Sequence, residues 1–163
     1  MEALVKQNGV RAQGIEIDER AIYACVAKGL SVIHQDIETG LSEYSDGSFD
    51  YVMLAGSLQQ VKKPDSVLKE ALRVGKKIIV SFPNFGHYKV RFQILLEGKV
   101  PVTPSLPFEW YDTPNLHFLS ILNFIEYCQK RGNRIEKSAF LNRGRVNFLP
   151  NLRAETALFL LSS

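Results

Sequence analysis

Short apolar runs alternate with amphipathic helical patterns along the first half of the chain, and this alternation most restricts the fold. The helical patterns between the runs begin at Glu19 and at Lys63-Pro64-Asp65. Strands joined through helices form βαβ units, in which the strands are parallel and the crossovers right-handed. The sequence therefore predicts an α/β fold with a largely parallel sheet. The predicted strands are Arg11–Ile17, Leu30–His34, Phe49–Leu54 and Lys76–Asn84.

Further helices are predicted at both ends of this region. The first residues, 1–7, are typical of the end of a helix that Asn8-Gly9 stops. A helix over His87–Glu97 would turn Val90, Ile94 and Leu95 inward and leave His87, Lys89 and Arg91 to solvent.

The C-terminal third predicts one more helix and a pair of strands. The helix covers Leu119–Lys130 and stops at Gly132. Residues 133–140 and 154–161 are strand-like runs joined by a loop with several arginines. We expect them to form an antiparallel pair at the edge of the sheet.

Composition bounds the class of protein. A length of 163 residues with 45% apolar and 23% charged residues predicts a single globular domain. The net charge of +3 comes from scattered cations, which argues against nucleic-acid binding. We expect a cytoplasmic protein with no export signal and no membrane segment. Cys25 and Cys128 have no metal-ligand spacing and are expected to be buried, reduced thiols.

Two carboxylates follow neighbouring predicted strands. Glu16 and Ile17 end the first strand, and Asp36 and Ile37 follow the second. Ligands of open parallel sheets bind outside the carboxyl ends of the strands, where an acid can accept both hydrogen bonds of a ribose diol. The alternatives stay open: Glu16 as an acid near a helix start, and Asp36 as the cap of the following turn.

The third strand runs into small residues, Ala55 and Gly56. Small residues at the carboxyl end of a strand let backbone and ligand approach closely. These two positions are therefore candidates for the floor of a pocket.

A long loop rich in proline and aromatic residues follows, from Gly98 to His117. Loops of this length in compact domains usually cover a site or meet a partner. Trp110 and Tyr111 are of the residue types that dominate protein interfaces. The alternative is a loop packed on its own core.

The order of these segments resembles class I S-adenosylmethionine-dependent methyltransferases, which have a Rossmann-like sheet with a C-terminal antiparallel strand pair. The matching stretches are Gly14–Asp18, Gln35-Asp36, Phe49–Val52, Leu72–Gly75 and Ile79–Asn84. More narrowly, Ser81–His87, Pro101–Thr103 and Glu109–Asn115 are similar to the methionine-biosynthesis MetW family.

The resemblance implies a cofactor site for S-adenosyl-L-methionine. Glu16, beside Ile17, would be the ribose acid, and Asp36 with Ile37 would contact the adenine. Residues 55–60, with Ala55, Gly56 and Gln59, would form the wall beside the methionine portion. Members of the family begin with a strand and a glycine-rich loop that precede the start of this chain, so we expect a longer gene product whose first strand is missing here.

The resemblance also implies a function as a methyltransferase-like partner and activator of homoserine O-acyltransferase, the MetX-type enzyme, with Trp110 and Tyr111 at the contact. The alternative is an active methyltransferase with an unknown acceptor, and the pattern assigns no catalytic residue. Association into a homo-oligomer is left open. A hydrolase and a metal site are disfavoured, because no Gly-x-Ser-x-Gly turn and no ligand spacing are present.

Overall fold

The computed structural model describes residues 9–162. The chain forms two compact units, one ending at Tyr44 and the other beginning at Ser45. The organisation as a single domain stays a prediction, and the helix predicted over residues 1–7 lies outside the described residues. Among residues 9–162, no helix combines the length and the apolar character that crossing a bilayer would require.

The N-terminal unit is a βαβ unit followed by two short helical turns. Strand β1 (Gln13–Glu16) leads through helix α2 (Glu19–Ala27) into strand β2 (Ser31–His34). The strands pair in parallel, with Glu16 opposite His34. Helix α2 begins after Asp18, whose carboxylate accepts the Arg20 N–H at 3.1 Å. The unit continues into α3 (Ile37–Gly40) and the 3₁₀ turn η1 (Leu41–Glu43), and the predicted parallel pair is confirmed.

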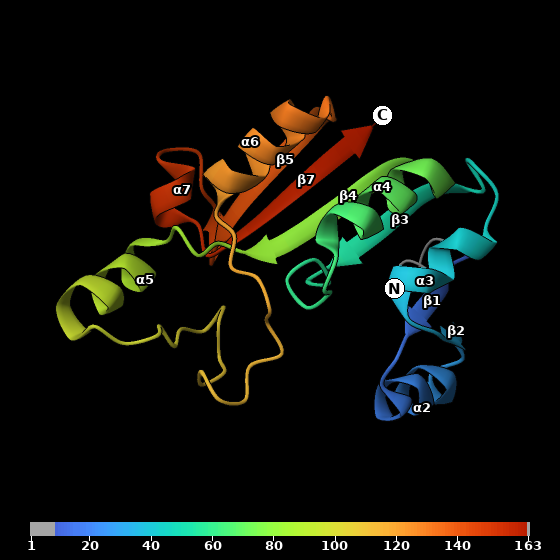
Figure 1. The fold of residues 1–163 in the computed structure, drawn as a ribbon, viewed down its shortest axis with the longest axis horizontal. Helices are drawn as coiled ribbons and strands as arrows, with labels where there is room; N and C mark the ends of the chain where they lie inside the picture. The colour runs from blue at the N-terminus through green and yellow to red at the C-terminus, as the bar shows by residue number, and fades with distance from the viewer. Residues whose placement is uncertain (1–8, 163) are drawn as a thin grey trace. The chain divides into compact units, whose positions relative to one another are not determined.

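The C-terminal unit is built on a five-stranded sheet with the order β3-β4-β7-β5-β6 (Figure 1). The pair β3–β4 is parallel, and the pairs β4–β7, β7–β5 and β5–β6 are antiparallel. The predicted C-terminal pair is therefore present, but β7 lies inside the sheet and not at its edge. The elements are β3 (Phe49–Ala55), α4 (Pro64–Val74), β4 (Gly75–Pro83), α5 (Tyr88–Phe92), the π-helical turn η2 (Gln93–Glu97), α6 (Ile121–Arg131), β5 (Arg134–Asn142), β6 (Gly144–Arg145), α7 (Pro150–Arg153) and β7 (Thr156–Ser162).

The core of this unit lies on the face of the sheet that α4 and α6 cover (Figure 1). Phe82 on β4 and Phe159 on β7 are fully buried there. The ring of Phe124 on α6 lies 5.1 Å from the Phe82 ring and 4.9 Å from the Phe159 ring, between centroids. Each such buried side chain contributes roughly 1.5–3 kcal/mol relative to its exposed state. This aromatic cluster therefore fixes α6 on the sheet.

Capping explains where α6 starts and stops. The Ser120 hydroxyl accepts the Asn123 N–H, and the Asn123 side chain accepts the Ser120 N–H in return. Gly132 ends the helix with a positive φ of 72°, which glycine adopts without steric cost. The predicted stop is confirmed.

Exposure differs among the elements of this unit. Strand β3 is an edge strand of the five-stranded sheet, and its Tyr51 and Met53 side chains are exposed. Ile94 and Leu95 were expected to face inward, and both are exposed. The reason is that α5 ends at Phe92, where the chain passes into η2 and leaves the face that Val90 buries.

The two cysteines differ in burial. Both are free; Cys128 on α6 is fully buried, whereas Cys25 on α2 is only half-buried, so the expectation of two buried thiols holds for one of them. Burial raises the pKa of the Cys128 thiol to about 11. Cys128 is therefore an unreactive part of the core.

Candidate functional site

Glu16 ends β1, and its carboxylate is held by the turn that follows. Oε1 accepts the backbone N–H of Ile17 at 2.8 Å and that of Asp18 at 3.1 Å. Oε2 has no hydrogen-bond partner among residues 9–162. A carboxylate offers roughly four lone-pair sites, so the group can accept about two more hydrogen bonds. The turn therefore orients Glu16 and leaves it the acceptor capacity that a diol needs.

Asp36 follows β2 and caps α3. Its Oδ1 accepts the Glu38 N–H at 2.9 Å, as the capping alternative expected. Oδ2 has no partner within the described part of the chain. Ile37 is the first residue of α3, where backbone N–H groups have no partner inside the helix. One acceptor and one donor are therefore adjacent at this strand end.

The parallel pairing brings these two strand ends together. The Gln35 N–H donates to the Glu16 carbonyl at 3.0 Å, and Nε2 of His34 is 3.2 Å from the Ile17 carbonyl oxygen. Glu16, Ile17, Asp36 and Ile37 consequently share one end of the β1–β2 pair, as the sequence predicted.

Ala55, Gly56 and Gln59 lie in the other unit, at the carboxyl end of β3. Gly56 has a φ of 71°, and its N–H donates to the Ser81 carbonyl of β4 at 2.9 Å. This bond extends the pairing of β3 with β4 by one residue, and the positive φ at the strand end explains the choice of glycine. That these three residues contact a cofactor stays a prediction.

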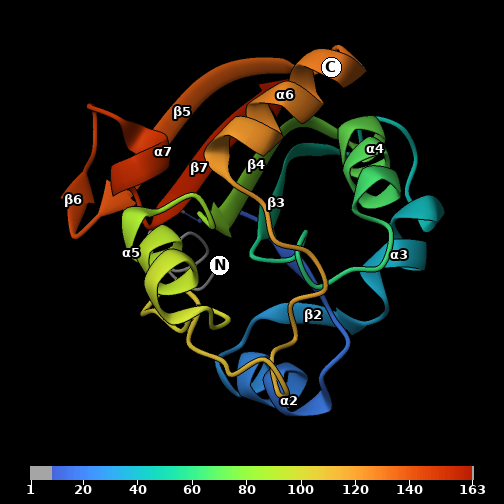
Figure 2. The ribbon, with the colours of Figure 1, turned by 60° about the vertical axis from the view of Figure 1, so that its left-hand side comes forward.

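Gln59 is 4% exposed and anchors the long loop. Its backbone carbonyl accepts the Leu116 N–H at 2.7 Å and the His117 N–H at 3.1 Å. Figure 2 shows the loop running from η2 back to α6 past the turn that follows β3. Because these bonds join residues far apart in the sequence, no local pattern could have indicated them.

Trp110 and Tyr111 lie on the same loop and are 68% and 70% exposed. Their rings contact each other edge to face, with centroids 5.7 Å apart. The alternative of aromatic residues packed on their own core is therefore wrong for this pair. Two exposed aromatic rings held side by side form a surface suited to a protein partner.

Two comparisons with known proteins bear on identity. Residues 1–161 match the family described as methionine biosynthesis protein MetW. The chain belongs to the MetW family. A bifunctional methionine biosynthesis protein MetXA/MetW from Rhodopirellula baltica is 32% identical over 154 residues. That match covers 91% of this chain and 25% of the relative, so the chain spans a quarter of the relative's length.

Solved structures show the fold of this MetW-family protein. An S-adenosylmethionine-dependent methyltransferase from Archaeoglobus fulgidus aligns with a TM-score of 0.71 and 14% identity, over 98% of this chain and 79% of that one. One from Thermotoga maritima aligns with a TM-score of 0.66 and 17% identity, over 97% of this chain and 75% of that one. The N-terminal domain of EvdMO1 with SAH bound aligns with a TM-score of 0.56 and 19% identity. The alignment covers 98% of this chain and 66% of that one. The predicted class I methyltransferase fold is confirmed.

The sequence pattern did not indicate the structural role of Asn84 in this MetW-family protein. Asn84, which follows β4, is fully buried, and its Nδ2 donates to the carbonyls of Asn151 at 3.0 Å and Ala154 at 2.8 Å. Its Oδ1 accepts the N–H of Gly86 at 3.0 Å and that of Ile121 at 3.2 Å. The carboxamide thus joins β4 to α6 and α7. An asparagine directly after Pro83 at a strand end was the only signal for it.

His87 was expected to face solvent and is 1% exposed. Its Nδ1 accepts the Lys89 N–H at 3.4 Å and caps α5. Burial lowers the pKa of the His87 imidazole, so the ring is neutral at pH 7. The residue therefore supports the fold and is withdrawn from the surface.

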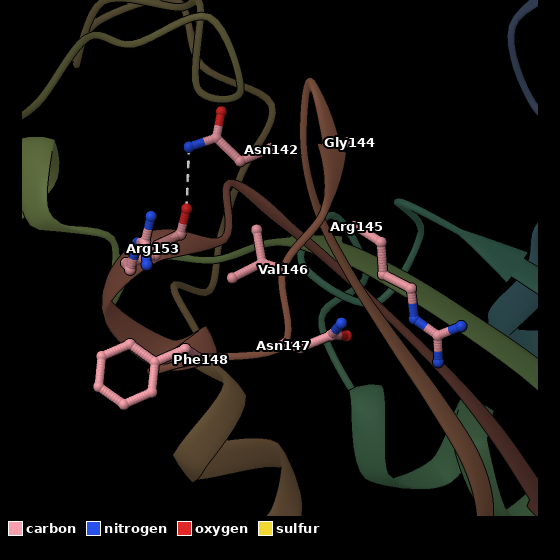
Figure 3. A pocket seen from close by; sticks show the side chains of 7 residues that line it. All are labelled: Asn142, Gly144, Arg145, Val146, Asn147, Phe148 and Arg153. Atoms are coloured by element: carbon pink, nitrogen blue, oxygen red, sulfur yellow. Dashed lines mark hydrogen bonds between the residues drawn. The ribbon is translucent and has the colours of Figure 1, made fainter.

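A recess of about 390 Å³ lies where β5, β6 and α7 meet, lined by Asn142, residues 144–148 and Arg153 (Figure 3). The Asn142 side chain donates to the Arg153 carbonyl at 2.9 Å. The side chains of Arg145 and Arg153 point away from each other, so they do not form a joint anion clasp. None of the predicted site residues lines this recess. Within residues 9–162, no His, Cys, Asp or Glu side chains gather into a potential metal site.

Proposed function

We propose that this MetW-family protein is an S-adenosylmethionine-binding, methyltransferase-like partner and activator of homoserine O-acyltransferase in methionine biosynthesis. The observation that carries the proposal is the relative that is named for both MetXA and MetW. The part of that relative that matches this chain is a quarter of the relative's length. Joining two proteins in one chain raises their effective concentration for each other. Such a fusion supports a partnership between the separate proteins as well.

The surface proposed for the acyltransferase is the exposed pair Trp110 and Tyr111, together with the apolar residues of η2. Leu95 is 78% exposed, and Leu96 is exposed beside it. Large apolar side chains that gather on a surface usually mark an interaction site. Arg91 on α5 is exposed and adds positive charge to this surface, which supports recognition of a protein surface with acidic groups.

The cofactor part of the proposal rests on the N-terminal unit. The remaining acceptor capacity of Glu16 suits the two hydroxyl groups of a ribose, and Oδ2 of Asp36 suits an exocyclic amine. The backbone bonds that already orient both carboxylates reduce the entropy lost on binding. S-adenosylmethionine, the ligand class of proteins with this fold, carries both groups.

Complex formation tests the proposed partnership. The purified MetW-family protein and the homoserine O-acyltransferase of the same organism are expected to elute together from a size-exclusion column, with the combined mass in light scattering. The reason is that a joint interface covers the exposed apolar side chains of the loop and η2.

The control is the same column run with an unrelated acyltransferase, which should elute separately. Separate elution of the cognate pair at micromolar concentration, with and without S-adenosylmethionine, would remove the partner function.

A further inference from the structure

The side chain of Gln59 holds a buried polar atom that lowers the stability of the folded state. Its Oε1 is buried and has no hydrogen-bond partner among residues 9–162. The cleft around it is too narrow for a water molecule to enter. A buried acceptor without a partner costs roughly 1–3 kcal/mol. Native structures contain few such groups, and each calls for an explanation.

Four residues of the segment Asn115–Leu119 line one side of this cleft, and Pro83, Phe85 and Leu106 line the rest. The attachments of the segment are the two N–H bonds to the Gln59 carbonyl, the bond from the Phe85 N–H to the Leu119 carbonyl at 3.1 Å, and the Phe118 ring, 4.8 Å from the Phe85 ring. The side chains of Leu116 and Phe118 remain largely exposed. Segments with few buried apolar contacts open locally at a low free-energy cost.

We propose that Asn115–Leu119 is a lid over a small ligand pocket whose floor is the carboxamide oxygen of Gln59. The pocket lies at the carboxyl ends of β3 and β4, where ligands of open α/β sheets bind. Because the atom that opening of the lid would uncover is an acceptor, the group that binds there is a hydrogen-bond donor, an amine or a hydroxyl. A carboxylate or phosphate would meet repulsion from the same oxygen. In the closed state the oxygen is buried without a hydrogen-bond partner among residues 9–162. Opening of the lid lets the oxygen accept a hydrogen bond and so removes this free-energy cost.

Hydrogen exchange of the Leu116 and His117 amides tests the lid directly. Gln59→Met keeps the length of the side chain and removes the unpaired oxygen, so the closed state gains stability. Exchange of these two amides is expected to slow by about tenfold, the lower part of the range that the buried acceptor implies. Gln60→Met, at the exposed neighbouring position, is expected to leave the exchange unchanged. Equal or faster exchange in Gln59→Met would overturn the proposal.

Two further measurements complete the test. Phe118→Ala removes the ring contact and is expected to speed exchange of the same amides while those of β4 and β7 keep their protection. Titration with ethanolamine, which carries an ammonium and a hydroxyl, is expected to shift the amide resonances of residues 55–60 in the wild type and not in Gln59→Met. If Phe118→Ala leaves the exchange unchanged, the segment is no lid; if ethanolamine causes no shift, the pocket does not take donors.

Discussion

Replacing Asn84 with alanine is expected to lower the free energy of unfolding by about 3 kcal/mol. The substitution removes all four hydrogen bonds of the carboxamide, which link β4 to Gly86, to Ile121 at the start of α6 and to two carbonyls of α7 and its C-cap. These backbone groups lie in or near the core and lose their partner without gaining water. Urea unfolding followed by circular dichroism measures the change as a lower midpoint at unchanged slope.

Asn84→Asp separates hydrogen bonding from packing. The aspartate keeps the size of the side chain and the acceptor for Gly86 and Ile121, but turns an oxygen toward two carbonyl oxygens. It is expected to be as damaging as alanine near neutral pH. Asn147→Ala, at an exposed asparagine, is the matched control and should change the free energy of unfolding by less than about 0.5 kcal/mol. An Asn84→Ala protein as stable as this control would show that the bonds contribute little.

Element order could be predicted because periodicity and stop signals act locally. The strand run at Arg11–Ile17 became β1, Gly132 stopped α6, and the two C-terminal runs became β5 and β7. Each depends on a residue and its near neighbours, so one sequence suffices.

Burial was harder to predict because it depends on what lies across the sheet. The eleven-residue pattern from His87 to Glu97 allows more than one inward face, and the change to η2 after Phe92 selects one that excludes Leu95. The apolar run of β3 indicated a strand correctly, but the pattern could not show that the strand lies at the edge of the five-stranded sheet.

The candidate site divides in the same way. The neighbouring positions of Glu16 and Asp36 follow from the rule that parallel strands place their carboxyl ends at one edge. The bonds between Gln59 and the loop depend on tertiary structure alone and could not be predicted.

Trp110→Ala and Tyr111→Ala are each expected to weaken binding to homoserine O-acyltransferase by about thirtyfold, the effect of a loss of roughly 2 kcal/mol at an interface hot spot. Both rings are exposed in the free protein and contact each other edge to face. Binding to a partner would therefore remove most of their apolar surface from water. Surface plasmon resonance with immobilised acyltransferase gives the dissociation constants.

The matched control for these variants is Tyr23→Ala, because Tyr23 on α2 is as exposed as the loop aromatics and lies in the other unit. It should bind as the wild type does. All three variants should keep the circular dichroism spectrum of the wild type, since the rings are on the surface. If the loop variants bind as tightly as Tyr23→Ala, the contact lies elsewhere on the protein.

Calorimetric titration of S-adenosylmethionine into the purified protein, at two temperatures, tests the central claim most directly. We expect saturable binding that Glu16→Ala weakens by about tenfold or more, since a charged hydrogen-bond acceptor is lost. Glu19→Ala, an exposed acid in the first turn of α2, should leave the affinity unchanged. Absence of binding at both temperatures, or equal affinity for Glu16→Ala and the wild type, would contradict the account of a nucleoside held by the acids at the ends of β1 and β2.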